Sequence, residues 1–372
     1  MRVTDVETIY VRSPHVRELC DSGQDALIVR VHTDAGITGI GEVDSSPLAA
    51  KGAIDGPFSH SVTSGLRHLV IGESPFATEK IWHKMYTRNL YGGRRGAGFH
   101  AMSGIDLALW DIKGKALGMP VWKLLGGGFH ERLRCYASSL WAPTPRETRD
   151  LARRYVDRGF TAVKFGWDPM GVDEETDIAL VREARAGLGE GPDLLVDAGL
   201  VWDAKTAIRR VRAFEEYGIY WLEEPLMPDN YDGYRRLSEA VDTRIAAGEE
   251  ESGRTSFLEL MDRGKIDVVQ VDLTRVGGFT EAVKVASLAQ DRGLAVANHG
   301  FTTYINVAAA LHFLNAIPNA LIAEFVAEEQ TTLRDELTRQ RIVARDGMLD
   351  IPQEPGLGVD LNEEAVARYR VA

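Results

Sequence analysis

The sequence predicts an α/β protein with a (β/α)8-type barrel preceded by a smaller α+β domain. From about residue 140 to residue 326, short apolar runs alternate with longer amphipathic segments, a rhythm typical of a parallel sheet. Eight such runs occur in about 190 residues, which fits a closed barrel better than an open sheet. The first part of the chain lacks this rhythm, and a chain of 372 residues has room for both domains.

The eight predicted strands are short, apolar and mostly closed by a polar residue. They are RLRCYASSL (132–140), TAVKF (161–165), DLLVD (193–197), IYWLEEP (219–225), TRIAAGEE (243–250), IDVVQVD (266–272), LAVANH (294–299) and ALIAEF (320–325). The segments between them are predicted helices. Thr144 to Glu147 is a capping-box pattern with Pro145 at the first helical position, and Gly159 follows the expected helix end. Residues 204–217 place apolar side chains at helical spacing before Gly218.

The N-terminal domain is predicted over residues 1–125, the barrel over 126–326, and a C-terminal segment over 327–372 that returns to the first domain. Residues 25–43 alternate around the Asp34-Ala35-Gly36 turn, which predicts an antiparallel hairpin. Residues 103–117 form a helical pattern that ends at Gly118. The glycine-rich stretches 48–60 and 89–98 are candidates for mobile loops.

Composition and charge exclude several classes of protein. The chain has 44% apolar and 26% charged residues, as a soluble globular enzyme does. Its net charge of −12 and its lack of a basic stripe argue against a nucleic-acid partner. The start lacks a signal-peptide pattern and no apolar stretch approaches the roughly 18 residues of a membrane span, so we expect a cytoplasmic protein without a membrane partner. Cys20 and Cys135 are expected to be reduced thiols.

An ionisable residue closes each of seven successive predicted strands, at intervals close to one strand-helix unit. These residues are Lys164, Asp197, Glu223, Glu249, Asp272, His299 and Glu324. A single carboxylate at a strand end is more often a solvated or helix-capping residue. Seven in register favour one common site, because the active site of such a barrel lies at the C-terminal ends of its strands.

The types of these residues suggest a metal and an acid/base pair. Asp197, Glu223 and Glu249 would repel one another if they converged without a cation, and hard oxygen ligands suit Mg²⁺. No Cys/His set for zinc is present. Asp272 could fix the tautomer of His299 and raise its basicity. A structural role is the usual alternative for a lone histidine.

Other polar and aromatic residues have weaker signals. Glu324 could exchange a proton with a substrate carboxylate if its pKa is raised. His312 lies in an apolar helical run and is predicted to pack in the core. Four tryptophans could line a pocket or pack in the core, namely Trp110, Trp141, Trp167 and Trp202.

At this point the chain resembles the enolase superfamily, and specifically its mandelate racemase branch, over its whole length. The matching motifs are SGIDLALWDIKGKALGMPVWKLLGG (103–127), VDAG, WLEEP, AAGEE, VDLTRVGG (271–278), ANHGF, AEF and PGLGVDL. The resemblance implies an α+β capping domain, formed by the N-terminal region and the C-terminal tail, on a modified (β/α)7β TIM-like barrel. Asp272, five residues before the first glycine of the GG pair, is what places the chain in this branch, because the muconate-lactonizing branch has a lysine there.

The resemblance also implies roles for the strand-end residues. Asp197, Glu223 and Glu249 would bind one Mg²⁺, and His299 with Asp272 would be the general acid/base dyad. Glu324 and Lys164 would contact the substrate carboxylate. Specificity is expected from cap loops near residues 15–24 and 44–60, and the remaining candidate substrate-binding residues are Asp44, Arg94 and Trp141. Dimers or octamers are also implied.

One position departs from the family pattern. Where the family often has Lys-x-Lys at the end of the second strand, this chain has Lys164-Phe165-Gly166, so the second base is missing. Racemisation needs groups on both faces of the α-carbon, whereas β-elimination of water needs one face. The leading hypothesis is therefore a Mg²⁺-dependent dehydratase of an aldonate or aldarate that gives a 2-keto-3-deoxy acid.

Two alternatives stay open. One is a racemase or epimerase in which Tyr91, Arg94 or Arg95 of the cap supplies the missing group. The other is a non-catalytic paralogue that only binds Mg²⁺ and an anion.

Overall fold

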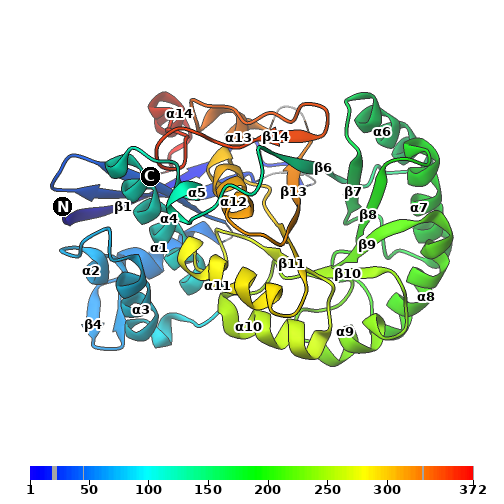
Figure 1. The fold of residues 1–372 in the computed structure, drawn as a ribbon, viewed down its shortest axis with the longest axis horizontal. Helices are drawn as coiled ribbons and strands as arrows, with labels where there is room; N and C mark the ends of the chain where they lie inside the picture. Colours follow the sequence, from blue (N-terminus) through cyan, green and yellow to red (C-terminus); the bar gives the residue numbers. More distant parts are fainter. Residues whose placement is uncertain (19–22, 45, 329–330, 372) are drawn as a thin grey trace.

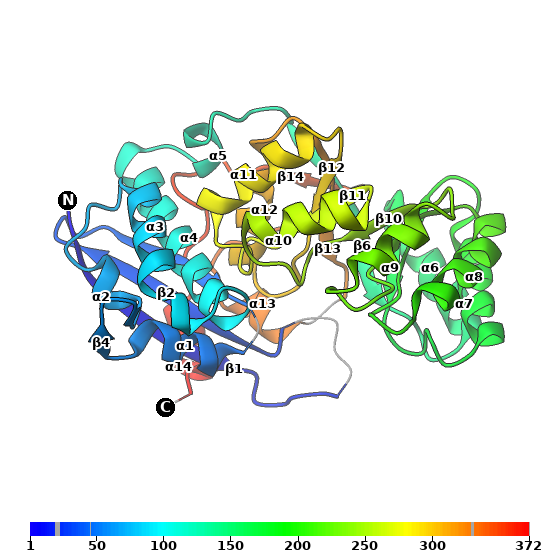
Figure 2. The same ribbon diagram turned by 90° about the horizontal axis from the view of Figure 1, so that it is seen from below.

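The computed structural model describes residues 1–18, 23–44, 46–328 and 331–371. A cap of N-terminal elements lies beside a barrel made from the middle of the chain (Figure 1). The view turned by 90° separates this cap from the barrel helices at the opposite end of the molecule (Figure 2).

The cap is a three-stranded antiparallel sheet covered by helices. Its strands are β1 (Val3–Arg12), β2 (Asp25–Thr33) and β3 (Thr38–Val43), and the predicted hairpin is confirmed as the β2–β3 pair. Its helices are α1 (Pro47–Asp55), α2 (Arg67–Val70), α3 (Thr78–Arg88) and α4 (Ala97–Leu117), with a small hairpin of β4 (Phe58–His60) and β5 (Thr63–Ser64). A Cβ on Gly41 would lie 2.0 Å from the carbonyl oxygen of Gly104, so glycine lets α4 pack closely on the sheet.

The barrel has eight parallel strands. They are β6 (Arg132–Leu140), β7 (Ala162–Gly166), β8 (Asp193–Asp197), β9 (Ile219–Glu223), β10 (Arg244–Ala247), β11 (Val268–Val271), β12 (Ala295–Asn298) and β13 (Ala320–Val326). Neighbours pair in chain order, and β13 pairs with β6 to close the sheet. The prediction of eight barrel strands is confirmed, because each predicted strand overlaps an observed one and their ends differ by at most three residues.

Seven helices connect these strands, so the barrel is of the (β/α)7β type. They are α6 (Pro145–Asp157), α7 (Glu174–Leu188), α8 (Ala204–Phe214), α9 (Tyr231–Ser238), α10 (Gly253–Glu259), α11 (Phe279–Gln290) and α12 (Tyr304–Asn315). Helix α6 begins as predicted, with the Thr144 hydroxyl accepting a hydrogen bond from the Glu147 amide. Short helical turns complete the chain: α5 (Val121–Leu124), η1 (Leu90–Gly92), η2 (Glu215–Tyr217), η3 (Leu260–Gly264) and α13 (Thr332–Glu336).

The C-terminal segment runs from the barrel to the cap. Strand β14 (Met348–Asp350) pairs antiparallel with β6, and helix α14 (Glu363–Tyr369) follows it. Arg370 then bridges to Val11 of β1, so the chain reaches the edge of the cap sheet at this residue (Figure 1).

Both stretches predicted to be mobile loops are partly helical, so that prediction is wrong in part. Residues 47–55 form α1, which begins with proline at its first turn and buries Ala50 and Ile54 against the cap core. An ion pair of 2.6 Å between Lys51 and Asp55, one turn apart, supports the same helix. In the second stretch, α4 begins at Ala97 rather than at Ser103. Residues 19–22 and 45, within the predicted specificity loops, lie outside the described residues.

The barrel interior is a compact apolar layer with one side chain from each strand. Its members are Tyr136, Ala162, Leu195, Trp221, Ala246, Val268, Ala297 and Ile322. Strand side chains alternate between faces, so the residue two positions further along each strand points to the same interior. This layer is therefore the floor beneath the C-terminal ends of the strands.

Buried carboxylates of the cap hold it to the barrel. Asp106 of α4 accepts hydrogen bonds from the amide (2.9 Å) and hydroxyl (2.6 Å) of Thr280 in the first turn of α11. Glu42 of β3 accepts from the Thr303 hydroxyl (2.7 Å) and the Asn306 amide (3.1 Å) at the start of α12. Each carboxylate thus caps a barrel helix whose first amides lack partners within the helix.

Two smaller expectations concern membranes and thiols. In the described ranges no helix combines the length and apolarity that a bilayer crossing requires. Cys135 is a buried free thiol, and Cys20 lies outside the described residues.

Candidate active site

The C-terminal ends of the barrel strands, which we call the barrel mouth, gather the ionisable residues that the sequence singled out. Two positions beyond the apolar floor stand Ser138, Lys164, Asp197, Glu223, Gly248, Gln270, His299 and Glu324. A cavity of about 450 Å³ opens over them. Five of the predicted residues line it, namely Lys164, Asp197, Glu249, His299 and Glu324. Glu223 and Asp272 are buried behind them.

Lys164 of β7 lies among three carboxylates. Its Nζ is 2.5 Å from Glu223 Oε1, 2.8 Å from Glu324 Oε1 and 3.8 Å from Asp197 Oδ2. Burial lowers the pKa of Lys164, but the charges of Glu223 and Glu324 outweigh it and hold the pKa well above its ordinary value. In this arrangement the group is held as an ammonium, which favours a role in binding negative charge over a role as a base.

Glu324 of β13 is an ionised carboxylate in this arrangement. Burial raises its pKa, but the ammonium of Lys164 and the charge of His299 lower the pKa by more than burial raises it, so the net shift is downward. Its Oε2 accepts a hydrogen bond of 2.8 Å from the Gly300 amide. A proton-donating Glu324 would need a raised pKa, and the structure gives a lowered one because Lys164 lies 2.8 Å away. The sequence did not reveal this contact.

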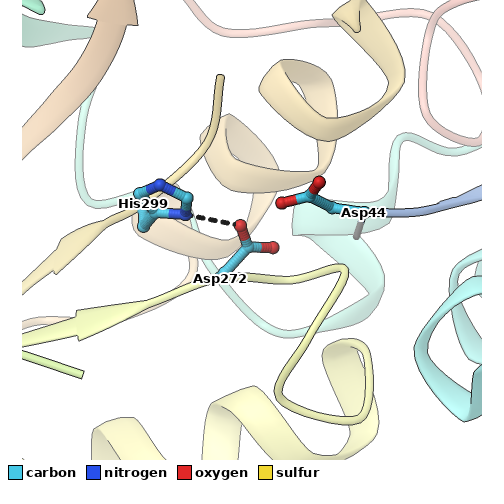
Figure 3. A group of neighbouring side chains, drawn as sticks. All are labelled: Asp44, Asp272 and His299. Carbon is cyan, nitrogen blue, oxygen red and sulfur yellow. Dashed lines mark hydrogen bonds and ion pairs between the residues drawn. The ribbon is translucent and has the colours of Figure 1, made fainter. Parts of the chain in front are cut away.

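His299 and Asp272 form a hydrogen-bonded pair (Figure 3). His299 Nδ1 lies 2.7 Å from Asp272 Oδ2, and the other oxygen of Asp272 accepts bonds of 2.6 Å from both the amide and the hydroxyl of Thr274. Since the carboxylate can only accept, Nδ1 carries the hydrogen. This leaves Nε2 as the nitrogen available on the cavity side, where Glu249 Oε2 lies 3.4 Å away.

The charges around this pair set its titration. Burial lowers the pKa of His299, but Glu249 and the bond to Asp272 raise it to about 10. Burial raises the pKa of Asp272, and the bond to His299 together with its charge brings it down to about 2. A cation held by Glu249 would offset the charge that keeps His299 protonated, and the imidazole could then act as a base near neutral pH.

The carboxylates of the mouth form an acidic cluster compatible with a metal site. Burial, and then the neighbouring Glu223, raise the pKa of Asp197 well above its ordinary value, and burial also raises that of Glu223. A nearby cation would stabilise the ionised form of these buried carboxylates. Their oxygen atoms are hard donors of the kind that Mg²⁺ binds. The carboxylates of the mouth therefore have the donor chemistry of a Mg²⁺ site.

The geometry of the predicted ligand trio differs from the expectation. In the described residues, two groups have ligand atoms within 4.8 Å of one another: Asp44 with Asp272 and His299, and Glu224 with Glu249 and Glu250. The trio of Asp197, Glu223 and Glu249 is not one of them. Lys164 Nζ lies against both Asp197 and Glu223, so an ammonium provides the positive charge at that point.

Gly166 is not an empty position. A Cβ built there would lie 2.7 Å from the Cβ of Asp197 on the neighbouring strand, so even alanine would require Asp197 to move. Strand pairing sets Gly166 opposite Asp197, and the pocket is lined by both. The glycine thus makes room for a carboxylate of the cluster, and a larger side chain at this position would displace Asp197.

Three predicted substrate-binding residues do not line the cavity. Trp141 is buried and stacks on Phe165 with ring centroids 5.1 Å apart. Arg94 lines a separate cavity beside α3 and α10, together with Arg95. Asp44 forms an ion pair with Arg275, which does line the cavity, and Asp44 itself lines an adjoining cavity. Burial and packing decided these positions, which strand-end spacing does not report.

Sequence reasoning missed Arg275, whose guanidinium joins the cap to the mouth. It contacts Asp44 Oδ2 at 2.6 Å and Glu249 Oε1 at 3.5 Å, and it lines the cavity. Its position three residues after Asp272, in the motif VDLTRVGG, was the available signal. Ser138 and Ser139 of β6 also line the cavity, and a pattern of ionisable strand ends does not mark them because they carry no charge.

The fold and site define an enzyme class in which a capped (β/α)7β barrel presents an acid/base pair and an acidic cluster at its mouth. Residues 147–365 match the family model described as "Enolase C-terminal domain-like". Residues 4–126 match the one described as "Mandelate racemase / muconate lactonizing enzyme, N-terminal domain". The chain belongs to the mandelate racemase/muconate lactonizing enzyme family of the enolase superfamily, as its motifs had indicated.

Relatives with assigned names cover almost the whole chain. The D-galactarolactone cycloisomerase of Agrobacterium fabrum is 32% identical, with 93% of this chain and 91% of the relative aligned. The L-rhamnonate dehydratase of Saccharopolyspora erythraea is 32% identical over 92% of this chain and 84% of the relative. The crystal structure of the 3,6-anhydro-D-galactonate cycloisomerase from Zobellia galactanivorans superposes with a TM-score of 0.90 at 31% identity, covering 100% of both chains.

Proposed function

We propose that this protein is a Mg²⁺-dependent acid-sugar dehydratase, a hydro-lyase that converts an aldonate or aldarate to a 2-keto-3-deoxy acid. Relatives named as dehydratases of rhamnonate, xylonate, arabinonate and galactonate support dehydration of an acid sugar. Asp197, Glu223 and Glu249 are the proposed metal ligands. A bound Mg²⁺ would stabilise the negative charge that develops on the substrate carboxylate.

The His299–Asp272 dyad is proposed to move both protons of the reaction. His299 Nε2 takes the proton from the α-carbon, and the electron pair of that bond moves toward the carboxylate. Asp272 stabilises the imidazolium through the bond at 2.7 Å. The imidazolium then gives its proton to the β-hydroxyl as the carbon–oxygen bond breaks, which releases water and leaves an enol that becomes the 2-keto acid.

Lys164 is proposed to hold the substrate carboxylate while charge builds on it. Its ammonium is preorganised by Glu223 and Glu324, so little reorganisation is needed during the reaction. Glu324 is proposed to orient Lys164 and the substrate rather than to supply a proton, because its pKa is lowered.

The single observation that supports elimination over racemisation is the asymmetry of the mouth. One side has the dyad, and the opposite side has Gly166 packed against Asp197. The cap residues suggested as replacements do not line the cavity: Tyr91 is 78% exposed, and Arg95 pairs with Asp229 at 2.7 Å. The carboxylates around Lys164 raise its pKa, which disfavours it as the second base.

The test is a screen of the Mg²⁺-loaded protein against a library of acid sugars, with formation of 2-keto acid measured by semicarbazide. Turnover of at least one acid sugar is expected. Solvent deuterium entering the α-carbon without keto acid would favour the racemase instead, and binding without either reaction would favour the non-catalytic paralogue.

Ring opening of a cyclic acid sugar is a second candidate, favoured by relatives that are named cycloisomerases. Departure of a ring oxygen from the β-carbon is the same elimination, with the proton of His299 delivered to an alkoxide or carboxylate leaving group. Including lactones and anhydro sugar acids in the library separates the two activities, because water is a product only of dehydration.

A further inference from the structure

The rim of the mouth cavity is acidic. Its charge would act on the end of the substrate that is remote from the reacting carboxylate. Three exposed carboxylates line the cavity above the buried cluster: Glu18 of the cap, Asp168 after β7 and Glu250 after β10. Within the described ranges none of the three forms an ion pair. These three residues are called the rim carboxylates below.

The cations that line the same cavity already have carboxylate partners. Lys164 is shared by Glu223 and Glu324, at 2.5 and 2.8 Å. Arg275 is held by Asp44 at 2.6 Å and lies 3.5 Å from Glu249. Both lie deep in the mouth, with 5% and 9% of their side chains exposed, where one substrate carboxylate would bind.

No further lysine or arginine lines this cavity in the described part of the chain. The adjoining cavity contains the guanidinium of Arg12, but together with the carboxylates of Asp25 and Asp44. A second substrate carboxylate extending from the mouth would therefore meet mainly like charge. Hydroxyl groups would instead find acceptors, because carboxylates and the hydroxyls of Ser138 and Ser139 accept hydrogen bonds from them.

We propose that this site selects monoanionic acid sugars, meaning aldonates and the monolactones of aldarates, and discriminates against dianionic aldarates through the rim carboxylates. This inference rests on the proposed function and narrows its substrate class. Repulsion of the wrong partner is a general route to specificity, since it penalises the competitor without tightening the chosen ligand.

The experiment compares matched substrates that differ in charge. The Mg²⁺-loaded protein is assayed with an aldonate, with the aldarate of the same carbon skeleton, and with the monolactone of that aldarate. We expect kcat/KM for both monoanions to exceed that of the dianion by about tenfold or more, and the ratio to narrow as salt rises from about 0.02 to about 0.5 M. An aldarate dianion used as well as the monoanions would overturn the inference.

A variant tests the named residues. The double variant Asp168→Asn/Glu250→Gln should reduce the ratio of monoanion to dianion kcat/KM about tenfold, since two of the three repelling charges are gone. The matched control is Glu239→Gln, an exposed carboxylate at the end of α9, which should leave the ratio unchanged. An unchanged ratio in the double variant would assign the selectivity elsewhere and refute the role of the rim carboxylates.

Calorimetry separates this inference from the proposed function. Binding of an aldonate and of its aldarate is measured on the Mg²⁺-loaded wild type and on His299→Asn. Weaker binding of the aldarate supports the inference even if no acid sugar turns over, which would refute only the dehydratase. Equal or tighter binding of the aldarate refutes the inference while leaving dehydration intact.

Discussion

The cap–barrel interface and the barrel mouth both bury carboxylates, but they satisfy them in different ways. At the interface, Asp106 and Glu42 each accept from neutral amides and hydroxyls at the start of a barrel helix. At the mouth, Asp197, Glu223 and Glu324 lie around the ammonium of Lys164.

The titration of the two sets reflects this difference. Burial raises the pKa of Asp106 and of Glu42 to about 7 in each case, and neither forms an ion pair with another described residue. For Asp197, burial is reinforced by the charge of Glu223. A buried carboxylate is therefore not by itself a sign of catalysis. Crowding of several carboxylates with cations distinguishes the mouth from the interface.

The largest effect is expected from His299→Asn. Loss of the only proposed acid/base group on its face should lower kcat by about 10³-fold or more, because general acid–base catalysis contributes on that order. Steady-state keto-acid formation measures it, with Mg²⁺ binding as the control for an intact mouth. Full turnover in this variant would contradict both enzymatic hypotheses.

Arg275→Met should have the next effect, on stability. Asp44, Glu249 and Asp272 would lose a shared cation, and removing one partner of a buried ion pair costs about 3–5 kcal/mol. Urea unfolding measures the change, and Arg275→Lys should restore part of it. The control is Arg132→Met, whose exposed pair with Asp350 should be worth less than about 1 kcal/mol. Similar losses of unfolding free energy in both variants would mean that the buried ion pairs of Arg275 contribute no more to stability than an exposed pair does.

Mg²⁺ should stabilise the wild type and fail to stabilise Asp197→Asn. A ligand at a hundredfold excess over its Kd adds about 2.7 kcal/mol to the free energy of unfolding. Thermal unfolding with Mg²⁺ or with EDTA measures it, and Glu250→Gln is the comparison. If Glu250→Gln lost the stabilisation and Asp197→Asn kept it, the metal would belong to the neighbouring group of Glu224, Glu249 and Glu250.

The smallest effect is a pH dependence at the interface. Asp106 has a folded pKa of about 7 against an ordinary value of 3.8, so its contribution to stability is fully present below pH 3.8 and is lost as the pH rises through 7. Wild-type stability should therefore fall between pH 5 and pH 8 by on the order of 2.5 kcal/mol more than that of Asp106→Asn, because about 1.4 kcal/mol is lost for each pH unit up to the folded pKa. Urea unfolding at the two pH values measures this difference. Parallel losses would show that Asp106 does not titrate in this range.

The barrel could be predicted in detail because its signals are local. Apolar runs such as DLLVD coincide with β8, and the Thr144 cap begins α6 where expected. The glycine-rich region 48–60 misled the prediction, since its glycines did not prevent α1 from packing Ala50 and Ile54 on the cap core. Amphipathic burial there outweighed the loop signal of single glycines.

The site was predictable only where a residue type and a strand end coincide. His299 and Asp272 close neighbouring strands, and they lie within hydrogen-bond distance. Arg275, Glu18 and Asp168 had no such marker, because they stand on loops whose course depends on packing. Glu250 did end a predicted strand, next to Glu249, but was given no role. Trp141 and Arg94 were assigned to the cavity by residue type alone, and packing placed them elsewhere.

The sequence by itself determined the eight strands, their order and the ionisable residue at the end of seven of them, because strand period and parallel connection fix which side chains point inward. Only the tertiary structure decided how those charges meet. It placed Lys164 among three carboxylates, filled the position beside Gly166 with Asp197, and joined Asp44 of the cap to Arg275 of the barrel. These contacts link strands and domains distant in the chain, and their energies depend on separations of a few ångströms that no local pattern encodes.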